Sequence, residues 1–110
     1  MKTIRVILEE KIKKVLSKVE DSYMPIFTIG VYRGLTLAWA RCCSTGWYPG
    51  DRDAIDNFRM LHEAIEKKYN AMSEVLDPWT WDLIAPFMKG ILKGLEYARK
   101  IAENKEVEEK

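Results

Sequence analysis

Two rows of small residues, sixty positions apart, constrain more than any other feature what this chain can fold into. The first row is Gly30, Gly34 and Ala38, and the second is Gly90, Gly94 and Ala98. A four-residue repeat places the members of each row on one face of an α-helix. Each glycine inside a helix costs about 1 kcal/mol relative to alanine, so the rows need a compensating contact. We therefore expect close helix packing along both rows, either of one helix on the other or of each on copies in a partner chain.

The segments around the two rows are similar in sequence. Residues 26–38 and 86–98 share five identities in thirteen aligned positions, and Arg33 aligns with Lys93. The same offset gives little similarity between the segments that precede them. The pattern is compatible with two related helical hairpins that arose by duplication, and equally with two helices that converged on one packing solution.

Apolar residues recur with helical spacing over most of the chain. In residues 3–20 the apolar stripe consists of Ile4, Leu8, Ile12, Val15 and Val19, and the polar side carries Lys11, Lys13, Lys14 and Lys18. A second helix is expected from a cap at Ser22 to about Ser44. No segment shows the alternation that is typical of a strand. The sequence therefore predicts an all-α fold, a four-helix bundle.

Helix-terminating residues delimit the other two helices. A loop that contains Gly and Pro ends the second helix, and Asp51 or Asp53 caps a third. The Asp77–Pro78 pair ends the third helix and starts a fourth, which continues to about residue 103. Pro86 is expected to kink the fourth helix or to mark its start.

Length and composition indicate one folded domain. The chain has 110 residues, of which 47% are hydrophobic and 11% aromatic, and this apolar surface can offset the entropy of ordering the chain. We assign residues 1–104 to a single helical domain and residues 105–110 to a frayed, charged C-terminal tail. The absence of Gln and the abundance of Lys and Glu give a thermophile-like composition.

The formal net charge of +1 disfavours a polybasic nucleic-acid-binding arm or an acidic tail. This small value is a cancellation. Residues 22–50 contain two bases and no acid, whereas residues 51–82 contain four bases and eight acids. Unlike charges on different segments offer a polar route to self-association.

Three features favour a cytoplasmic protein without a membrane span. Arg33 lies near the centre of the most apolar helix, where it would strongly disfavour insertion into a bilayer. Charged residues interrupt the N-terminal segment before a long apolar run accumulates, which argues against a cleaved signal peptide. Cys42 and Cys43 are adjacent and could form a disulfide only with a strained backbone, so both are expected to be reduced thiols.

Residues suited to catalysis or metal binding are few. His62 is the only histidine, which excludes a multi-histidine metal site, and no local pattern indicates that either cysteine is an activated nucleophile. Two carboxylate pairs, Glu63/Glu66 and Glu74/Asp77, have the spacing used by magnesium-dependent all-α hydrolases. Such a site would need acids from another helix or subunit. We predict no catalytic residue, metal or cofactor, and keep a metal-dependent hydrolase as a third option.

Large aromatic residues stand at two helix junctions. Such side chains either cover the end of a core or bind a partner. With two arginines as charged anchors, they form our candidate interface: Trp47, Tyr48, Trp79, Trp81, Arg33 and Arg41. The favoured function is a small helical protein-interaction module without catalytic activity, in the form of a homodimer.

Two binding alternatives remain. In the first, Arg33, Arg41 and Lys93 converge on a small anion or nucleotide, because Arg33 and Lys93 occupy equivalent positions beside the two small-residue rows. In the second, scattered basic residues bind nucleic acid with Trp47 and Tyr48 as stacking surfaces. Nucleic-acid binding is the less favoured of the two, since the bases do not gather in one segment.

Overall fold

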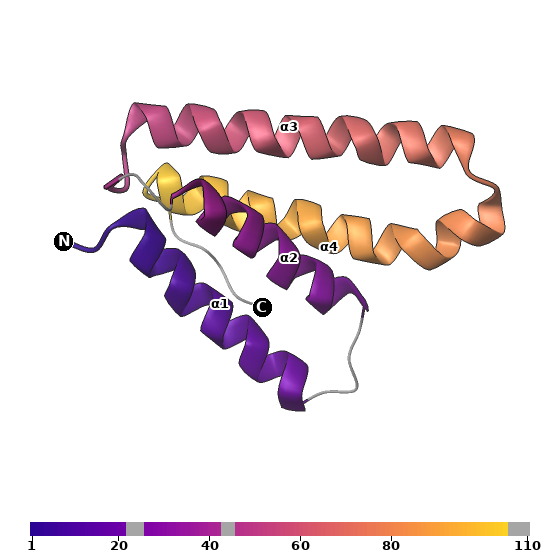
Figure 1. Ribbon diagram of the computed structural model, residues 1–110, viewed down its shortest axis with the longest axis horizontal. Coiled ribbons are helices and arrows are strands. Elements are labelled where there is room, and N and C mark those ends of the chain that lie inside the picture. Colours follow the sequence, from indigo (N-terminus) through magenta and orange to yellow (C-terminus); the bar gives the residue numbers. More distant parts are fainter. Residues whose placement is uncertain (22–25, 43–45, 106–110) are drawn as a thin grey trace.

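The computed structural model of the protein describes residues 1–21, 26–42 and 46–105. These residues form four α-helices and no strand (Figure 1), which confirms the predicted all-α fold. The helices are α1 (Ile4–Asp21), α2 (Ile26–Arg41), α3 (Arg52–Val75) and α4 (Pro78–Ala102). None of the helices in the three described ranges is long and apolar enough to span a lipid bilayer.

The helix ends follow the capping residues closely. Asp51 rather than Asp53 is the N-cap of α3, and its side chain accepts a hydrogen bond from the Asp53 backbone N–H. Asp77 caps α4 as predicted, since its Oδ1 accepts from the Thr80 backbone N–H at 2.9 Å. Pro86 lies inside α4 and does not mark its start, because that helix already begins at Pro78.

Some predicted boundaries cannot be compared with the structure. The expected cap at Ser22 and the expected end near Ser44 lie outside the described residues, as does the predicted tail apart from Lys105. At the end of α4, Asn104 adopts a left-handed conformation with φ 60°. The Lys105 N–H then donates to the Lys100 carbonyl at 2.8 Å, which closes the helix in a Schellman motif.

The centre of the fold is the contact between α2 and α4 through the two small-residue rows. A Cβ atom placed on Gly30 would lie 2.8 Å from Gly90 Cα, and one placed on Gly34 would lie 3.0 Å from Gly94 Cα. These contacts would be with backbone atoms of the other helix, and a backbone cannot relieve a clash by changing a side-chain rotamer. The rows therefore let the two helix backbones touch, and the contact lies within one chain.

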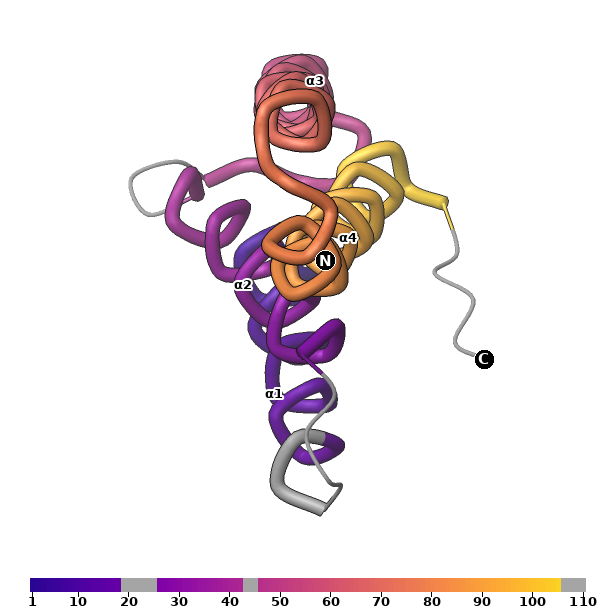
Figure 2. Tube along the Cα trace, turned by 90° about the vertical axis from the view of Figure 1, so that its right-hand side faces the viewer, coloured from indigo at the N-terminus to yellow at the C-terminus, as the bar shows by residue number. Residues whose placement is uncertain are grey.

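The α2–α4 contact has the register of the sequence similarity. Gly30 meets Gly90 and Gly34 meets Gly94, so α2 and α4 run parallel and each glycine faces the residue sixty positions away. α1 packs antiparallel on the outer side of α2, and α3 packs antiparallel on α4. Figure 2 shows the resulting order of α3, α4, α2 and α1. The fold is thus two helical hairpins joined back to back through α2 and α4.

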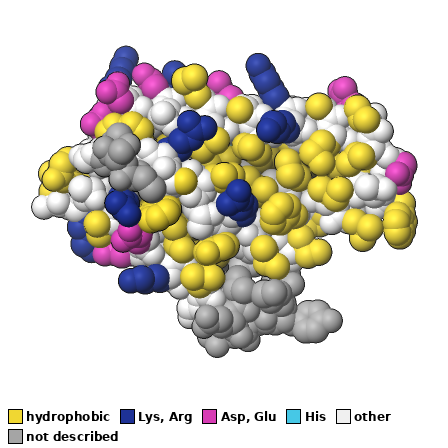
Figure 3. Space-filling model, in the orientation of Figure 1, with side chains coloured by type: hydrophobic (Ala, Val, Ile, Leu, Met, Phe, Trp, Pro, Cys, Tyr) yellow, Lys and Arg dark blue, Asp and Glu magenta, His cyan; other side chains and the backbone are white. Residues whose placement is uncertain are grey.

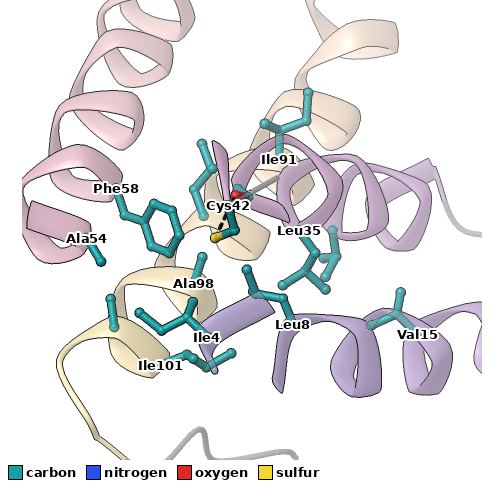
Figure 4. Close-up of a cluster of buried hydrophobic side chains, with 14 residues drawn as sticks. Ile4, Leu8, Val15, Leu35, Cys42, Ala54, Phe58, Ile91, Ala98 and Ile101 are labelled. Atoms are coloured by element: carbon teal, nitrogen blue, oxygen red, sulfur yellow. Dashed lines mark hydrogen bonds between the residues drawn. The ribbon is translucent and has the colours of Figure 1, made fainter. Parts of the chain in front are cut away.

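The hydrophobic core lies at one end of the molecule, which we call the closed end. There the start of α1, the end of α2, the start of α3 and the end of α4 meet (Figure 4). The fully buried side chains with the largest volumes are Phe58, Ile4, Leu8, Leu35, Leu95 and Cys42. The Sγ atom of Cys42 donates to the Ala38 carbonyl at 3.5 Å.

Backbone hydrogen bonds fasten the loop between α2 and α3 to the closed end. The Ile4 N–H donates to the Trp47 carbonyl at 2.9 Å, and the Gly50 N–H donates to the Ala102 carbonyl at 2.7 Å. Gly50 has φ 96° in a turn closed by the bond from the Asp51 N–H to the Tyr48 carbonyl. A Pro-Gly pair suits this turn because the third residue of a type II turn needs a positive φ.

The apolar stripe of α1 differs from the predicted one at two positions. Lys11, which we had placed on the polar side, is only 8% exposed, and Ile12 is half-buried. The buried stripe is Ile4, Leu8, Lys11 and Val15, whose spacings of four, three and four are as helical as those of the predicted stripe. The long apolar stem of a lysine can occupy such a position while its ammonium group finds a favourable contact.

Candidate functional site

The end of the α3–α4 hairpin that lies away from the core is the most exposed apolar region. No residue from position 59 to position 84 is buried, although the segment is helical except around the turn between α3 and α4. Hydrophobic side chains gather over this part of the molecule in Figure 3. The reason is helix length, because α3 and α4 have 24 and 25 residues but α2 has only 16. The longer hairpin extends about 12 Å past the start of α2.

The first two turns of α4 continue the face that packs on α2. Trp79 and Leu83 stand eight and four residues before Phe87, on the same side of the helix as Gly90. The contact with α2 covers this face only from Phe87 onward, since α2 begins at Ile26. Trp79 is 75% exposed and Leu83 55%. We call these two residues and the exposed Ile26 and Phe27, at the start of α2, the open-end patch; it thus consists of four residues.

Charges of opposite sign flank the open-end patch. Residues 73–83 carry three acids and no base, and all three acids, Glu74, Asp77 and Asp82, are exposed. In contrast, α2 carries no acid, and its two bases, Arg33 and Arg41, are exposed. Hydrogen bonds from the Thr80 N–H and hydroxyl lower the pKa of Asp77, so this carboxylate stays charged at neutral pH. The patch thus lies between an acidic hairpin end and a basic helix.

The structure separates the four candidate aromatic residues into two groups. Trp47 lies at the closed end, where its ring meets Phe58 edge to face at 6.1 Å, and Tyr48 beside it is exposed. Trp81 lies at the opposite end of α3 with its ring 4.9 Å from that of Tyr69. Trp47 and Trp81 are half-buried within their own chain, which leaves Trp79 as the most exposed of the four.

The three cationic residues predicted to share an anion lie in different surroundings. Arg41 borders a hollow with Met60 and Leu61, whereas Lys93 lies 5.2 Å from the ring centroid of Tyr97 and 3.6 Å from the Glu96 carboxylate. None of the larger cavities in the described part of the chain is lined by two of the three cations. Their joint anion site stays a prediction.

A lysine-lined cleft runs between α1 and α4, and α2 also borders its smaller part. A cavity of about 330 Å³ opens beside the closed end, and a second one of about 230 Å³ opens further along α1. Lys11 lines both, and its Nζ lies 4.7 Å from the ring centroid of Tyr97. The other lysines in the lining are Lys14, Lys18 and Lys105. The sequence pattern does not indicate this cleft, because the spacing of apolar residues predicts Lys11 on the polar side of its helix.

A third hollow, of about 390 Å³, lies between α3 and α4 around His62. The Arg99 guanidinium donates to His62 Nδ1 at 2.8 Å, so the imidazole is neutral and carries its proton on Nε2. Burial lowers the pKa of His62, and the charge of Arg99 lowers it further. Glu66 and Glu96 line the same hollow, but Glu96 is paired with Lys93 and Lys100.

Metal ligands do not gather among residues 1–21, 26–42 and 46–105, where no group of three or more His, Cys, Asp or Glu could hold an ion. Glu63 and Glu66 are exposed on α3, and Glu74 and Asp77 are exposed near the end of the hairpin. Comparison of the chain with models of protein families, with curated proteins and with solved structures finds no match in any of the three.

Proposed function

We propose that the chain is a non-catalytic interaction module that forms a homodimer, in which the open-end patch of each subunit packs against the patch of the other. The observation that carries the proposal is the hairpin end, which has apolar residues at helical spacing and no buried side chain from residue 59 to residue 84. Exposed apolar patches of this kind mark interaction surfaces in folded proteins.

The distribution of charge supports a second copy as the partner. A contact that placed the two hairpin ends directly on each other would bring the acids around Trp79 together. A two-fold contact that sets the hairpin end of one copy on the start of α2 of the other brings those acids toward Arg33, the base of α2 that is nearer to the patch. The same contact is made twice, which is the usual arrangement in symmetric dimers.

The proposal extends the packing already present within the chain. Trp79 and Leu83 lie on the face of α4 that accepts α2 further along the helix. A helix from a second copy would complete that row of contacts. Aromatic side chains at the centre of an interface contribute a large share of its binding energy. We therefore expect Trp79 to contribute more to the dimer than any rim charge.

Light scattering of the purified chain across a range of concentrations tests this proposal. The unmodified protein is expected to have the mass of a dimer, and the double variant Trp79→Ser/Leu83→Ser the mass of a monomer with unchanged helix content. Met60→Ser is the matched control, because Met60 is also exposed but lies outside the patch. A monomeric unmodified protein, or a dimer that survives the double substitution, would contradict the proposal.

Charge reversal distinguishes this dimer from other pairings through the same patch. Arg33→Glu and the pair Glu74→Lys/Asp82→Lys should each weaken the dimer, since each leaves like charges opposed. Mixing the two variants restores opposite charges at both contacts of the mixed dimer. A heterodimer tighter than either variant dimer is the expected result. If mixing has no effect, the hairpin end does not face α2 of the other copy.

A further inference from the structure

Lys11 occupies a core position of α1 that an apolar residue would fill at lower cost. It follows Leu8 by three residues and precedes Val15 by four, and both of these neighbours are buried. Removing an ammonium group from water is unfavourable unless an interaction compensates it. In this chain the Nζ atom lies over the ring of Tyr97, which supplies one such interaction. The chain thus holds a cation at a helix position whose neighbours in the stripe are apolar.

The cleft around Lys11 concentrates positive charge. Lys14 and Lys105 line its larger cavity, and Lys14 makes no ion pair with any residue in the described ranges. Lys18 lines the smaller cavity. Glu10 is the one carboxylate in the two linings, and its Oε1 already accepts from Lys2 at 2.6 Å. Lys105 is paired with Glu103 at 3.0 Å, and among the described residues the two linings contain four lysines and one carboxylate.

The rest of the lining is mixed, with Asn104 in the larger cavity, Thr28 in the smaller one, and several apolar residues. Ile7, Pro49 and Ile101 line the larger cavity, and the ring of Tyr97 lines the smaller one. A cavity of about 330 Å³ is within the range of small-ligand sites. Lysines act as point charges and do not make the paired contacts by which arginine selects a planar carboxylate. Several lysines around one cavity therefore suit an anion with more than one charge.

We infer that the cleft between α1 and α4 is a binding site for an organic phosphate that carries two or more negative charges, such as a nucleoside diphosphate. Lys11 and Lys14 bind the phosphate oxygens, and the organic part lies against Ile7, Pro49 and Ile101. The inference is independent of the homodimer, because the residues assigned to the ligand line the larger cavity, and Phe27 of the open-end patch lines only the smaller one. It also differs from an anion site at Arg33, Arg41 and Lys93.

Isothermal titration of the full chain at low ionic strength tests the site with three probes. Adenosine diphosphate is expected to bind, inorganic pyrophosphate to bind more weakly, and adenosine not to bind. Lys11→Met keeps the apolar stem and removes the charge, so it should weaken binding of adenosine diphosphate by about tenfold or more. Lys14→Met should weaken it as well. Lys13→Met is the control, because Lys13 lies on the same helix and does not line either of the two cavities.

Thermal unfolding of the same variants separates a binding lysine from a structural one. If Lys11 serves binding, the Lys11→Met variant keeps or raises the melting temperature, because a buried charge has been replaced by an apolar group. A lower melting temperature with unchanged binding would overturn the inference. Three further results would also overturn it: no binding of adenosine diphosphate, equal losses in the Lys13→Met and Lys11→Met variants, or binding of pyrophosphate alone.

Discussion

The two ends of the α3–α4 hairpin have similar amphipathic sequences but very different surroundings. At the closed end, Ala54 and Phe58 of α3 are completely buried in the hydrophobic core. At the open end, the same helix runs from Arg59 to Val75 without a buried residue. An amphipathic pattern thus specifies which face of a helix is apolar, but the lengths of the neighbouring helices decide how much of that face is covered.

Apolar residues at the two ends also differ in how much they contribute to the stability of the fold. Burial stabilises the fold only where the residue leaves water, so the closed end supplies most of the hydrophobic contribution. Exposed side chains such as Leu83 can be replaced at little cost to the isolated chain. Apolar residues at the open end are therefore available for contact with a partner, whereas those at the closed end stabilise the fold.

The largest expected effect comes from the contact that holds the two hairpins together. Gly94→Leu would place a branched side chain against the backbone of α2 near Val31 and Gly34. Since backbone atoms cannot move aside as side chains do, we expect a loss of about 3 kcal/mol or more in the free energy of unfolding. Chemical denaturation measures it. An unchanged transition would mean that α2 and α4 do not pack through the small-residue rows.

A second pair of substitutions compares the two ends directly. Phe58→Ala removes a fully buried ring at the closed end and should cost about 3–5 kcal/mol of stability. Leu83→Ala at the open end should change the stability of the monomer by less than about 0.5 kcal/mol. Both values come from urea denaturation at a concentration where the chain is monomeric. Equal losses would show that the open end is as well covered as the closed one.

Much of the fold could be predicted from local signals. Asp77 and Pro78 fix the start of α4 because a cap and a rigid first residue act over one helical turn. The small-residue rows predicted which residues make a close helix contact, and the structure shows that the contact is between α2 and α4 of one chain, the first of the two predicted alternatives. The position of Lys11 was not predicted, because its burial depends on Tyr97 of a helix that lies far away in the sequence.

The candidate sites were harder to predict than the fold. Trp47 and Trp79 belong to similar junctions in the sequence, yet one packs against the core and the other is exposed. The difference arises because α2 is shorter than α4. The sequence predicts each end of α2 only to within several residues. Nothing in the sequence marks Leu83 as exposed, because it has the same helical spacing as the residues of a core. Such residues can be assigned to a core or to a surface only once their neighbours are placed.

The smallest expected effect concerns His62, which pairs with Arg99 between the two ends. Its pKa in the folded chain lies below the usual value of 6.5, because burial and the guanidinium both disfavour the protonated ring. The unfolded chain therefore binds the proton more tightly than the folded one. Stability from this residue is complete above pH 6.5 and is lost as the pH falls through that value toward the lower folded pKa.

Melting temperatures on both sides of this window test the sign for His62. Unmodified protein should melt at a lower temperature at about pH 5 than at about pH 7.5, and His62→Gln should show a smaller decrease, since glutamine does not titrate there. Asp77 does not confuse the result, because its lowered pKa places its own titration below 3.8. Equal decreases in the two proteins would mean that the contact between Arg99 and His62 Nδ1 does not persist in solution. A larger decrease in the variant would reverse the assigned direction of the pKa shift.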